Sequence, residues 1–346
     1  MPEHISKARR TPSMEWTRMT DVQIGRRRMM TPDLQDKIRE AEQVLRLAAD
    51  MSLTYYHKPL IICYSGGKDS DVMLDIAKRC LEPSQFEVLN SHTTVDAPET
   101  VYHIREVFKR CEAEGIRTEI RMPTYKGEPT SMWKLIELKT IPPTRLLRYC
   151  CTILKEASTP NRMAAVGVRE DESTKRRGRS SFGVLAHRDE REWRSLQHTY
   201  AMFKLDQLGK EDAYECKIIQ SCKENKDTLC NPIYHFTESD IWEYVRAFDI
   251  PMNPLYAQGF RRVGCIGCPL AGAKEQKREF SLYPKYKENY IKAFDRAIQK
   301  RKREGKETTF KNGEEQMRWW LGEHIRQIRI EDILEEVNNA DTDEHP

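Results

Sequence analysis

The sequence lacks a long hydrophobic run. No segment approaches the ~20 consecutive apolar residues that a membrane-spanning helix requires. Residues 1–10, which include Lys7, Arg9 and Arg10, also lack the apolar core of a secretory signal. We therefore expect a cytoplasmic protein with no membrane partner.

A strong net charge is absent as well. Lysine and arginine total 58 and aspartate and glutamate total 54, so the net charge of +4 does not by itself indicate a nucleic-acid partner. A hydrophobic content of 38% beside 32% charged residues indicates a polar but foldable globular protein. The 346 residues are enough for one large domain or two ordinary ones.

Basic residues nevertheless concentrate in two segments. Arginine and lysine outnumber acidic residues in 1–30, and the amphipathic pattern over 283–303 combines lysine and arginine with Tyr286 and Tyr290. Such segments could follow a nucleic-acid backbone. They could equally be a solvated arm and the exposed side of a packed helix. Nucleic acid is therefore an alternative partner.

The strongest signal is the stretch that begins with the apolar residues Leu60–Tyr64. These residues predict a buried strand, and the helical spacing of apolar residues after Asp69 predicts a helix. Between them lie the residues Ser65, Gly66, Gly67, Lys68, Asp69 and Ser70, here called the phosphate loop. A glycine turn that opens a helix directs free N–H groups and the positive end of the helix dipole at one place, which favours phosphate. The alternative is an ordinary strand–turn–helix corner.

Strands and helices alternate around this loop. Further strands are predicted at 86–91, 117–122, 163–168 and 229–234, with helices at 99–114, 144–155 and 237–248 among others. This alternation predicts an α/β fold with a doubly wound, mostly parallel five-stranded sheet and helical N- and C-terminal extensions. We divide the chain into an arm and helix (1–56), the sheet domain (57–250, with an insertion at 174–228) and a C-terminal part with a helical cap and acidic tail (251–346).

Two further motifs follow predicted strands, where ligands of such sheets bind. Glu99 lies in a Pro-Glu-Thr motif after the second strand, a position that also suits an ordinary helix start. Arg169 and Arg176 follow the fourth strand and can hold phosphate or sulfate with two hydrogen bonds each. We expect Glu99, Arg169 and Arg176 to join the phosphate loop in a nucleotide site.

Ten cysteines in a protein of this kind argue for metal or redox chemistry rather than disulfides. Cys150 and Cys151 are adjacent, and Cys265 and Cys268 form a C-x-x-C motif, the usual spacing for two ligands of one metal or cluster. Adjacent cysteines converge poorly on one zinc ion, whereas a 4Fe-4S cluster spreads its iron atoms. We therefore favour a 4Fe-4S cluster held by these four cysteines.

Other interpretations of the cysteines remain. Structural zinc is the second, a redox-active Cys265/Cys268 dithiol the third, and small buried side chains the last. Cys230, at the start of the fifth strand, could replace one of the adjacent pair.

Taken together, these motifs resemble the phosphoadenosine phosphosulfate (PAPS) reductase family of the adenine nucleotide alpha-hydrolase (PP-loop) superfamily, over about residues 57–290. The resemblance rests on the phosphate loop, Glu99 and Arg169 with their neighbours, and Asn253-Pro-Leu-Tyr256 before the C-x-x-C motif. The four cysteines are similar to those of iron–sulfur adenylylsulfate reductases and of relatives that use ATP to insert sulfur, including DNA phosphorothioation proteins. The resemblance implies a Rossmann-like fold that binds an adenine nucleotide.

One departure concerns the reaction. Sulfonucleotide reductases of this family attack sulfate with a cysteine in a C-terminal tail, whereas no cysteine follows Cys268 here. The Ser-Gly-Gly-Lys-Asp-Ser loop is also the form typical of members that split ATP to AMP and pyrophosphate. We therefore expect a sulfurtransferase-type enzyme that uses ATP with Mg²⁺, with Lys68, Asp69 and Arg169 as catalytic residues and a partner protein that donates sulfur or electrons. A sulfonucleotide reductase and a non-catalytic nucleotide- or nucleic-acid-binding component are the alternatives.

Overall fold

The computed structural model describes residues 30–155, 162–172, 182–184 and 228–323. Its main sheet has the strand order β3-β2-β1-β6-β8-β7. The first five strands are parallel: β3 (Arg117–Arg121), β2 (Phe86–Ser91), β1 (Leu60–Cys63), β6 (Met163–Ala165) and β8 (Thr228–Cys230). The short strand β7 (Phe182–Val184) pairs antiparallel with β8 and was not predicted. The α/β class with a mostly parallel sheet is thus confirmed.

The strand order reverses at β1. Leu60 pairs with Phe86 of β2, whereas Ile61 pairs with Ala164 of β6 on the opposite side. The chain therefore runs from β1 outward through β2 to β3 and then returns to the other side of β1. In such sheets ligands bind beyond the carboxyl ends of the strands at this reversal. The phosphate loop and the segment that contains Arg169 follow the two strands concerned.

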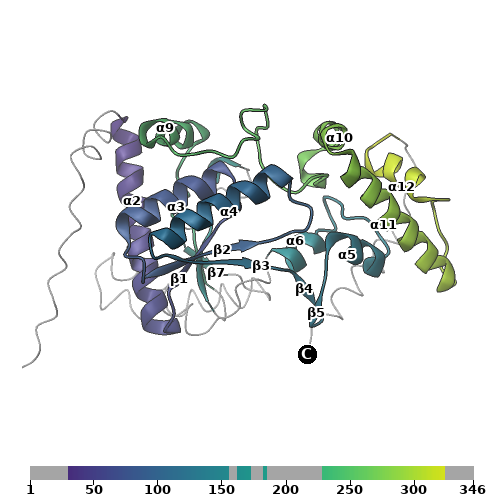
Figure 1. Cartoon of the computed structure of the whole chain (residues 1–346), viewed down its shortest axis with the longest axis horizontal. Coiled ribbons are helices and arrows are strands. Elements are labelled where there is room, and N and C mark those ends of the chain that lie inside the picture. Colours follow the sequence, from purple (N-terminus) through teal and green to yellow (C-terminus); the bar gives the residue numbers. More distant parts are fainter. Residues whose placement is uncertain (1–29, 156–161, 173–181, 185–227, 324–346) are drawn as a thin grey trace, which may run out of the picture.

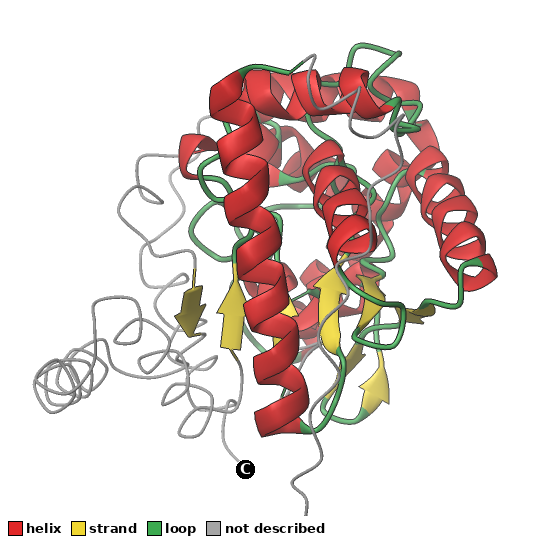
Figure 2. Ribbon diagram, turned by 90° about the vertical axis from the view of Figure 1, so that its left-hand side faces the viewer, coloured by secondary structure: helices red, strands yellow, loops and turns green. Residues whose placement is uncertain are grey.

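The larger core lies on one face of this sheet. Leu60 and Ile62 of β1 point into it, while Ile61 faces the other side, where it packs with Leu89 and Ala164. Four helices contribute to the larger core: α2 (Pro32–Met51), α3 (Lys68–Cys80), α4 (Pro98–Ala113) and α9 (Glu238–Phe248). Figure 2 shows the strands side by side in one layer with helices packed over them.

Local signals fix the ends of several helices. Pro32 occupies the first turn of α2, and the side chain of Thr31 accepts a hydrogen bond from Leu34 N. Thr237 and Asp240 form a reciprocal capping box at the start of α9. α2 continues into a π-helical turn, η1 (Ser52–Tyr56). None of the described helices is both long and apolar enough to cross a bilayer.

A second core lies beyond the carboxyl end of β2, because it includes Val95 and Ala97, which follow that strand. Tyr290, Phe294 and Trp320 form its aromatic centre. The elements around it occupy the right-hand side of Figure 1: the hairpin β4 (Thr124–Tyr125) and β5 (Glu128–Pro129), α5 (Met132–Lys139), α6 (Tyr149–Leu154), α10 (Ala273–Leu282), α11 (Pro284–Arg303) and α12 (Gly313–Trp320). Two short 3-10 turns, η3 (Glu170–Glu172) and η4 (Pro269–Ala271), complete the list of described elements.

Three predicted elements are shorter than expected, and the first of them, the strand predicted at 163–168, ends at Ala165. The strand predicted at 229–234 ends at Cys230, and Pro232, which has no N–H for a ladder hydrogen bond, lies in the turn that follows. The helix predicted at 144–155 begins only at Tyr149. There the hydroxyl of Thr144 accepts hydrogen bonds from Leu146 N and Leu147 N, so that the preceding residues form a turn instead.

Glu279 on α10 should make stability depend on pH. Its side chain is buried, its Oε2 accepts a 2.7 Å hydrogen bond from Gly267 N, and burial raises the pKa of the carboxyl from 4.5 to about 7. A raised folded-state pKa adds stability below the unfolded-state pKa, and this contribution is lost as the pH rises through about 7. In the wild type, the free energy of unfolding should fall by about 2–3 kcal/mol between about pH 5 and about pH 8 because of Glu279. We expect this fall to be absent in Glu279→Gln.

Denaturant unfolding at both pH values would measure this loss. Glu288→Gln, an exposed carboxylate on α11, is the matched control and should retain the wild-type pH dependence. An unchanged pH profile in Glu279→Gln would contradict the prediction.

Candidate functional site

The phosphate loop (65–70) connects β1 to the first turn of α3 and is closed by Ser70. The hydroxyl of Ser70 accepts hydrogen bonds from Gly67 N (3.2 Å) and Ser65 N (3.3 Å) and donates one to Gly67 O (2.7 Å). Gly66 has a φ of +72°, and a Cβ there would lie 2.9 Å from Ile104 Cγ1. The turn therefore needs glycine both for its backbone conformation and for space.

Two residues distant in sequence hold the loop from behind. The amide of the buried Asn253 donates to Gly66 O (3.0 Å) and to Thr100 Oγ1 (3.1 Å). Gly167 brings the segment after β6 against the first turn of α3, since a Cβ on Gly167 would lie 3.4 Å from the carbonyl carbon of Asp69. The loop is thus fixed by contacts from two distant parts of the chain.

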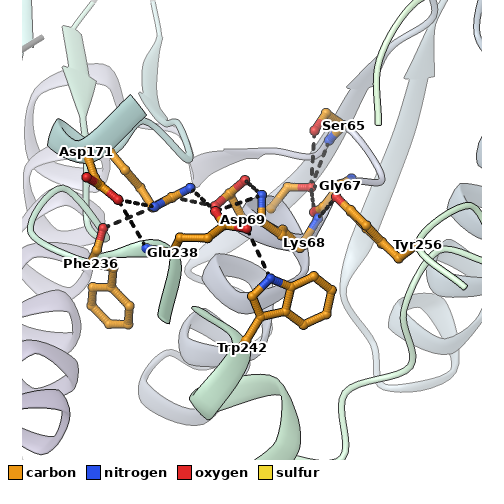
Figure 3. A network of polar contacts seen from close by, with 11 residues as sticks. Ser65, Gly67, Lys68, Asp69, Asp171, Phe236, Glu238, Trp242 and Tyr256 are labelled. Atoms are coloured by element: carbon orange, nitrogen blue, oxygen red, sulfur yellow. Dashed lines mark hydrogen bonds and ion pairs between the residues drawn. The ribbon is translucent and has the colours of Figure 1, made fainter. Parts of the chain in front are cut away.

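The predicted charged residues meet at the start of α3. Arg169 Nε donates to Asp69 Oδ1 (2.6 Å), and Lys68 Nζ lies 3.2 Å from Asp69 Oδ2. Glu238 at the start of α9 joins them, because its Oε2 lies 2.7 Å from Arg169 Nη2 and 3.3 Å from Lys68 Nζ (Figure 3). Lys68 and Arg169 are only 5% and 3% exposed, so both cations are buried beside carboxylates.

Glu238 was not singled out from the sequence. A glutamate directly after the N-cap Thr237 is what an ordinary helix start contains, so nothing local marks it as part of a site. In the structure its carboxylate lies between both cations, and its Oε1 accepts a hydrogen bond from Trp242 Nε1 (3.0 Å). Its position after the last parallel strand is the signal that could have indicated a role.

Two further residues, Glu99 and Arg176, were predicted to contact the nucleotide. Glu99 lies in the first turn of α4, where its Oε2 accepts a hydrogen bond from the hydroxyl of Tyr283 (2.9 Å). Desolvation and this hydrogen bond raise the pKa of Tyr283. Glu99 therefore links α4 to the C-terminal helices, and its contact with a nucleotide stays a prediction. Arg176 lies outside the described residues.

The structure brings together Cys150, Cys151, Cys265 and Cys268, here called the cysteine site. The thiols interact electrostatically: the other three cysteines each raise the pKa of Cys150, with the hydrogen bond to Cys151 as the largest cause. Cys150 and Cys265 also pack against the same second core. Cys230 instead lies in the larger core, away from this packing.

The C-x-x-C turn is rigidly built. Gly267 between the two cysteines has a φ of +75°, and a Cβ there would lie 2.4 Å from Phe280 Cζ. The hydroxyl of Tyr290 donates to Ile266 O (3.0 Å), and Gln276 Nε2 donates to Gly267 O (2.9 Å). The turn therefore holds its cysteines in place through backbone contacts with α10 and α11.

Two basic residues lie beside the cysteine site, although burial, as the largest cause, and Asp96 raise the pKa of Cys265. Arg148 Nη2 donates to Cys151 Sγ (3.5 Å), and the pKa of Cys151 is lowered, first by the hydrogen bond with Cys150 and then by Arg148. The pKa of Lys155 is raised, with Cys265 as the largest cause. Both basic residues favour thiolates over thiols. Lys155 was not picked out from the sequence, since its role depends on how α6 is placed against the C-x-x-C turn.

The thiols do not form a compact site for one ion. Within residues 30–155, 162–172, 182–184 and 228–323, no group of three or more His, Cys, Asp or Glu side chains is arranged to hold a metal ion. The four cysteines nevertheless offer one kind of donor, because each thiolate is a soft sulfur ligand.

Comparison with known proteins gives a family match. The model of the phosphoadenosine phosphosulfate reductase domain matches residues 59–271. An uncharacterized protein of Methanocaldococcus jannaschii is 26% identical over 250 residues, which cover 68% of this chain and 42% of that protein. An adenosine 5′-phosphosulfate reductase of Anoxybacillus flavithermus is 21% identical over 228 residues, 64% of this chain and 77% of the reductase. The reductase of Burkholderia cepacia is 49% identical over 41 residues, 12% of this chain and 16% of the enzyme.

The chain thus spans less than half the length of two of these three relatives. Among solved structures, the phosphoadenylyl-sulfate reductase of Candida auris aligns with a TM-score of 0.39 and 14% identity over 68% of this chain and 96% of that chain. The U34-tRNA thiolase of Methanococcus maripaludis with its [4Fe-4S] cluster aligns with a TM-score of 0.38 and 15% identity, over 80% of this chain and 83% of the thiolase.

Gly66→Ala should damage the phosphate loop selectively. The new methyl group would clash with Ile104 and a left-handed alanine would be strained by about 1–2 kcal/mol. We expect nucleotide affinity, measured by calorimetry, to fall by about tenfold or more. Gly127→Ala is the matched control, because Gly127 has a φ of +81° but open space around it. Equal nucleotide affinity in both variants would contradict this account of the loop.

Proposed function

This chain belongs to the phosphoadenosine phosphosulfate reductase family, and we propose that it binds ATP with Mg²⁺ and uses it to activate an acceptor for sulfur transfer. In the proposed first step, an acceptor oxygen attacks the α-phosphorus of ATP. The bond from that phosphorus to the bridging oxygen breaks, and pyrophosphate leaves with Mg²⁺. In the second step, a sulfur nucleophile displaces AMP from the adenylated acceptor.

The observation that carries this proposal is the balance of charge beside the phosphate loop. Lys68 and Arg169 provide two positive charges. Asp69 and Glu238, which each contact both cations, and Asp171, 3.8 Å from Arg169 Nη1, provide three negative charges. A metal-free sulfonucleotide would meet no uncompensated cation among these five residues. ATP that carries Mg²⁺ suits them better, because carboxylate oxygens are the ligands that Mg²⁺ prefers. Asp69 and Glu238 would then face the metal while Lys68 and Arg169 face phosphate oxygens.

Backbone groups would provide the remaining stabilisation. Helix geometry leaves the N–H groups of Asp69 and Ser70 without acceptors inside α3, and the helix dipole adds positive potential there. Such fixed donors stabilise the charge that develops on a phosphoryl group during transfer. The left-handed turn at Gly66 lets the phosphates approach these donors closely.

We further propose that the cysteine site holds a 4Fe-4S cluster, with zinc as the alternative. The four gathered thiols, the adjacent Cys150–Cys151 pair and the nearby Arg148 and Lys155 support this assignment. A four-iron cluster binds each thiolate at a separate iron, so the thiols need not converge on one point. When bound, the cluster would hold the transferred sulfur or set the electric field around an anionic substrate.

A second candidate is a sulfonucleotide reductase. Its support is the similarity to adenosine 5′-phosphosulfate reductases, which covers 64% of the chain in one case. This reaction would release sulfite from an activated sulfate in the presence of a thiol donor. It therefore predicts products different from those of the ATP reaction.

Product analysis would test the two reactions directly. We expect wild-type protein with Mg²⁺ and ATP to release pyrophosphate, and Lys68→Met to reduce this rate by about 100-fold, since it removes a charged donor to the phosphates. Lys109→Met, an exposed lysine paired with Glu106 on α4, should react as the wild type does. Sulfite from adenylylsulfate or PAPS without pyrophosphate from ATP would establish the reductase instead. Binding without turnover of any of the three nucleotides would contradict both enzymatic proposals.

Anaerobic purification would test the cluster. We expect brown protein with about four iron atoms per chain. Cys265→Ser should lose most of the iron and the visible absorption. Cys80→Ser on α3, far in sequence from the cysteine site, should retain both. A colourless protein that contains zinc and no iron would contradict the assignment.

A further inference from the structure

One backbone donor of the phosphate loop is occupied by a side chain. Lys68 N, the first N–H of α3, donates a 2.8 Å hydrogen bond to the hydroxyl of Tyr256 (Figure 3). An N–H at this position of a glycine turn is one of the groups that would otherwise bind a phosphate oxygen. The hydroxyl of Tyr256 therefore stands at the place where the proposed function needs a phosphate contact.

Tyr256 is held firmly in this place. It ends the Asn253–Tyr256 turn, in which Tyr256 N donates to Asn253 O (3.1 Å), and Asn253 is itself bound to Gly66 O. The ring packs edge-on against Trp242, with 5.5 Å between ring centroids and an interplanar angle of 89°. Trp242 is fixed in turn by its hydrogen bond to Glu238. The phosphate loop and α9 thus hold the ring of Tyr256 from two sides. This argues against a model in which Tyr256 has to leave this position before a phosphate can bind.

The hydroxyl has a proton to offer. It uses a lone pair to accept from Lys68 N, and an alcohol that accepts one hydrogen bond can still donate another. Burial raises the pKa of Tyr256, so the phenol keeps its proton at physiological pH. Tyr256 is only half-buried, and Gly67 lies beside its hydroxyl, since a Cβ on Gly67 would be in van der Waals contact with that oxygen at 3.5 Å.

We propose that Tyr256 is a substrate-binding residue whose O–H donates to a phosphate oxygen of the bound nucleotide, with Lys68 N polarising it from behind. This inference rests on the proposed nucleotide-binding function and adds a residue to it. In this arrangement the hydroxyl of Tyr256 replaces Lys68 N as the donor to the phosphate, and the phosphate lies one hydrogen bond further from the loop backbone. The phosphate would then contact the N–H groups of Asp69 and Ser70 together with a hydroxyl from a distant segment. Recognition therefore concerns the phosphate chain and not the base.

Tyr256→Phe tests this role, because it keeps the ring and removes only the hydroxyl. A hydrogen bond to a charged group contributes about 1.5–3 kcal/mol, so we expect affinity for ATP and for inorganic pyrophosphate to fall about 10- to 100-fold. Affinity for adenosine should not change. Calorimetry would measure all three ligands, and Trp242 fluorescence would report binding next to the altered ring. Tyr244→Phe, which loses a hydroxyl bonded to Asp75 in the core, should bind as the wild type does.

Tighter or equal binding of ATP and pyrophosphate by Tyr256→Phe would overturn the inference, because the hydroxyl would then only block Lys68 N. Unfolding midpoints of both variants would be compared with that of the wild type. If Tyr256→Phe is unstable, Tyr256→His retains a ring with an N–H donor and should keep part of the phosphate affinity. A wild-type protein that binds pyrophosphate but not ATP would reject the proposed function alone. A wild-type protein that binds neither would reject both.

Discussion

The hydrogen bond from Asn253 to Gly66 O is the constraint on which both sites depend. Gly66 must adopt a left-handed conformation for the loop to turn, and Asn253 binds the carbonyl that this conformation presents. The segment that begins at Asn253 then places Tyr256 on the first N–H of α3 and continues to the C-x-x-C turn. One short stretch of chain therefore shapes the phosphate loop and supplies half of the cysteine site.

Burial of charge is the second constraint. Lys68 and Arg169 are almost inaccessible to solvent, and such cations are destabilising unless carboxylates or phosphates pair with them. Asp69 and Glu238 fill this need in the ligand-free protein. The phosphates of a nucleotide would therefore either displace these carboxylates from the two cations or bring a metal cation that the carboxylates can bind. In the proposed reaction Mg²⁺ would be this cation, so the pattern of buried charges bears directly on which nucleotide binds.

The parts of the fold and site that sequence could predict are those with local signals. The phosphate loop, the α/β class and the meeting of Lys68, Asp69 and Arg169 follow from strand–turn–helix patterns and from the rule that carboxyl ends of parallel strands share an edge. Glu238 and Lys155 have no local signal, because each is a common residue at an ordinary helix end, and Tyr256 is marked only as part of the Asn253–Tyr256 motif, which does not show its contact with Lys68 N. Their roles come from tertiary packing. Strand β7 escaped prediction because it lies in the polar segment 174–228, whose sequence predicts an insertion and not a part of the sheet.

The two sites also share the segment that follows β2. Val95 O accepts a hydrogen bond from Ile266 N of the C-x-x-C turn, and Thr93 accepts one from the thiol of Cys265. At the other end of this segment, Thr100 binds Asn253 behind the phosphate loop. Seven peptide steps separate Thr93 from Thr100, so even a fully extended chain would place them at most about 25 Å apart. Because the last of these residues are already helical in α4, the true separation is smaller, and this one segment ties the phosphate loop to the cysteine site.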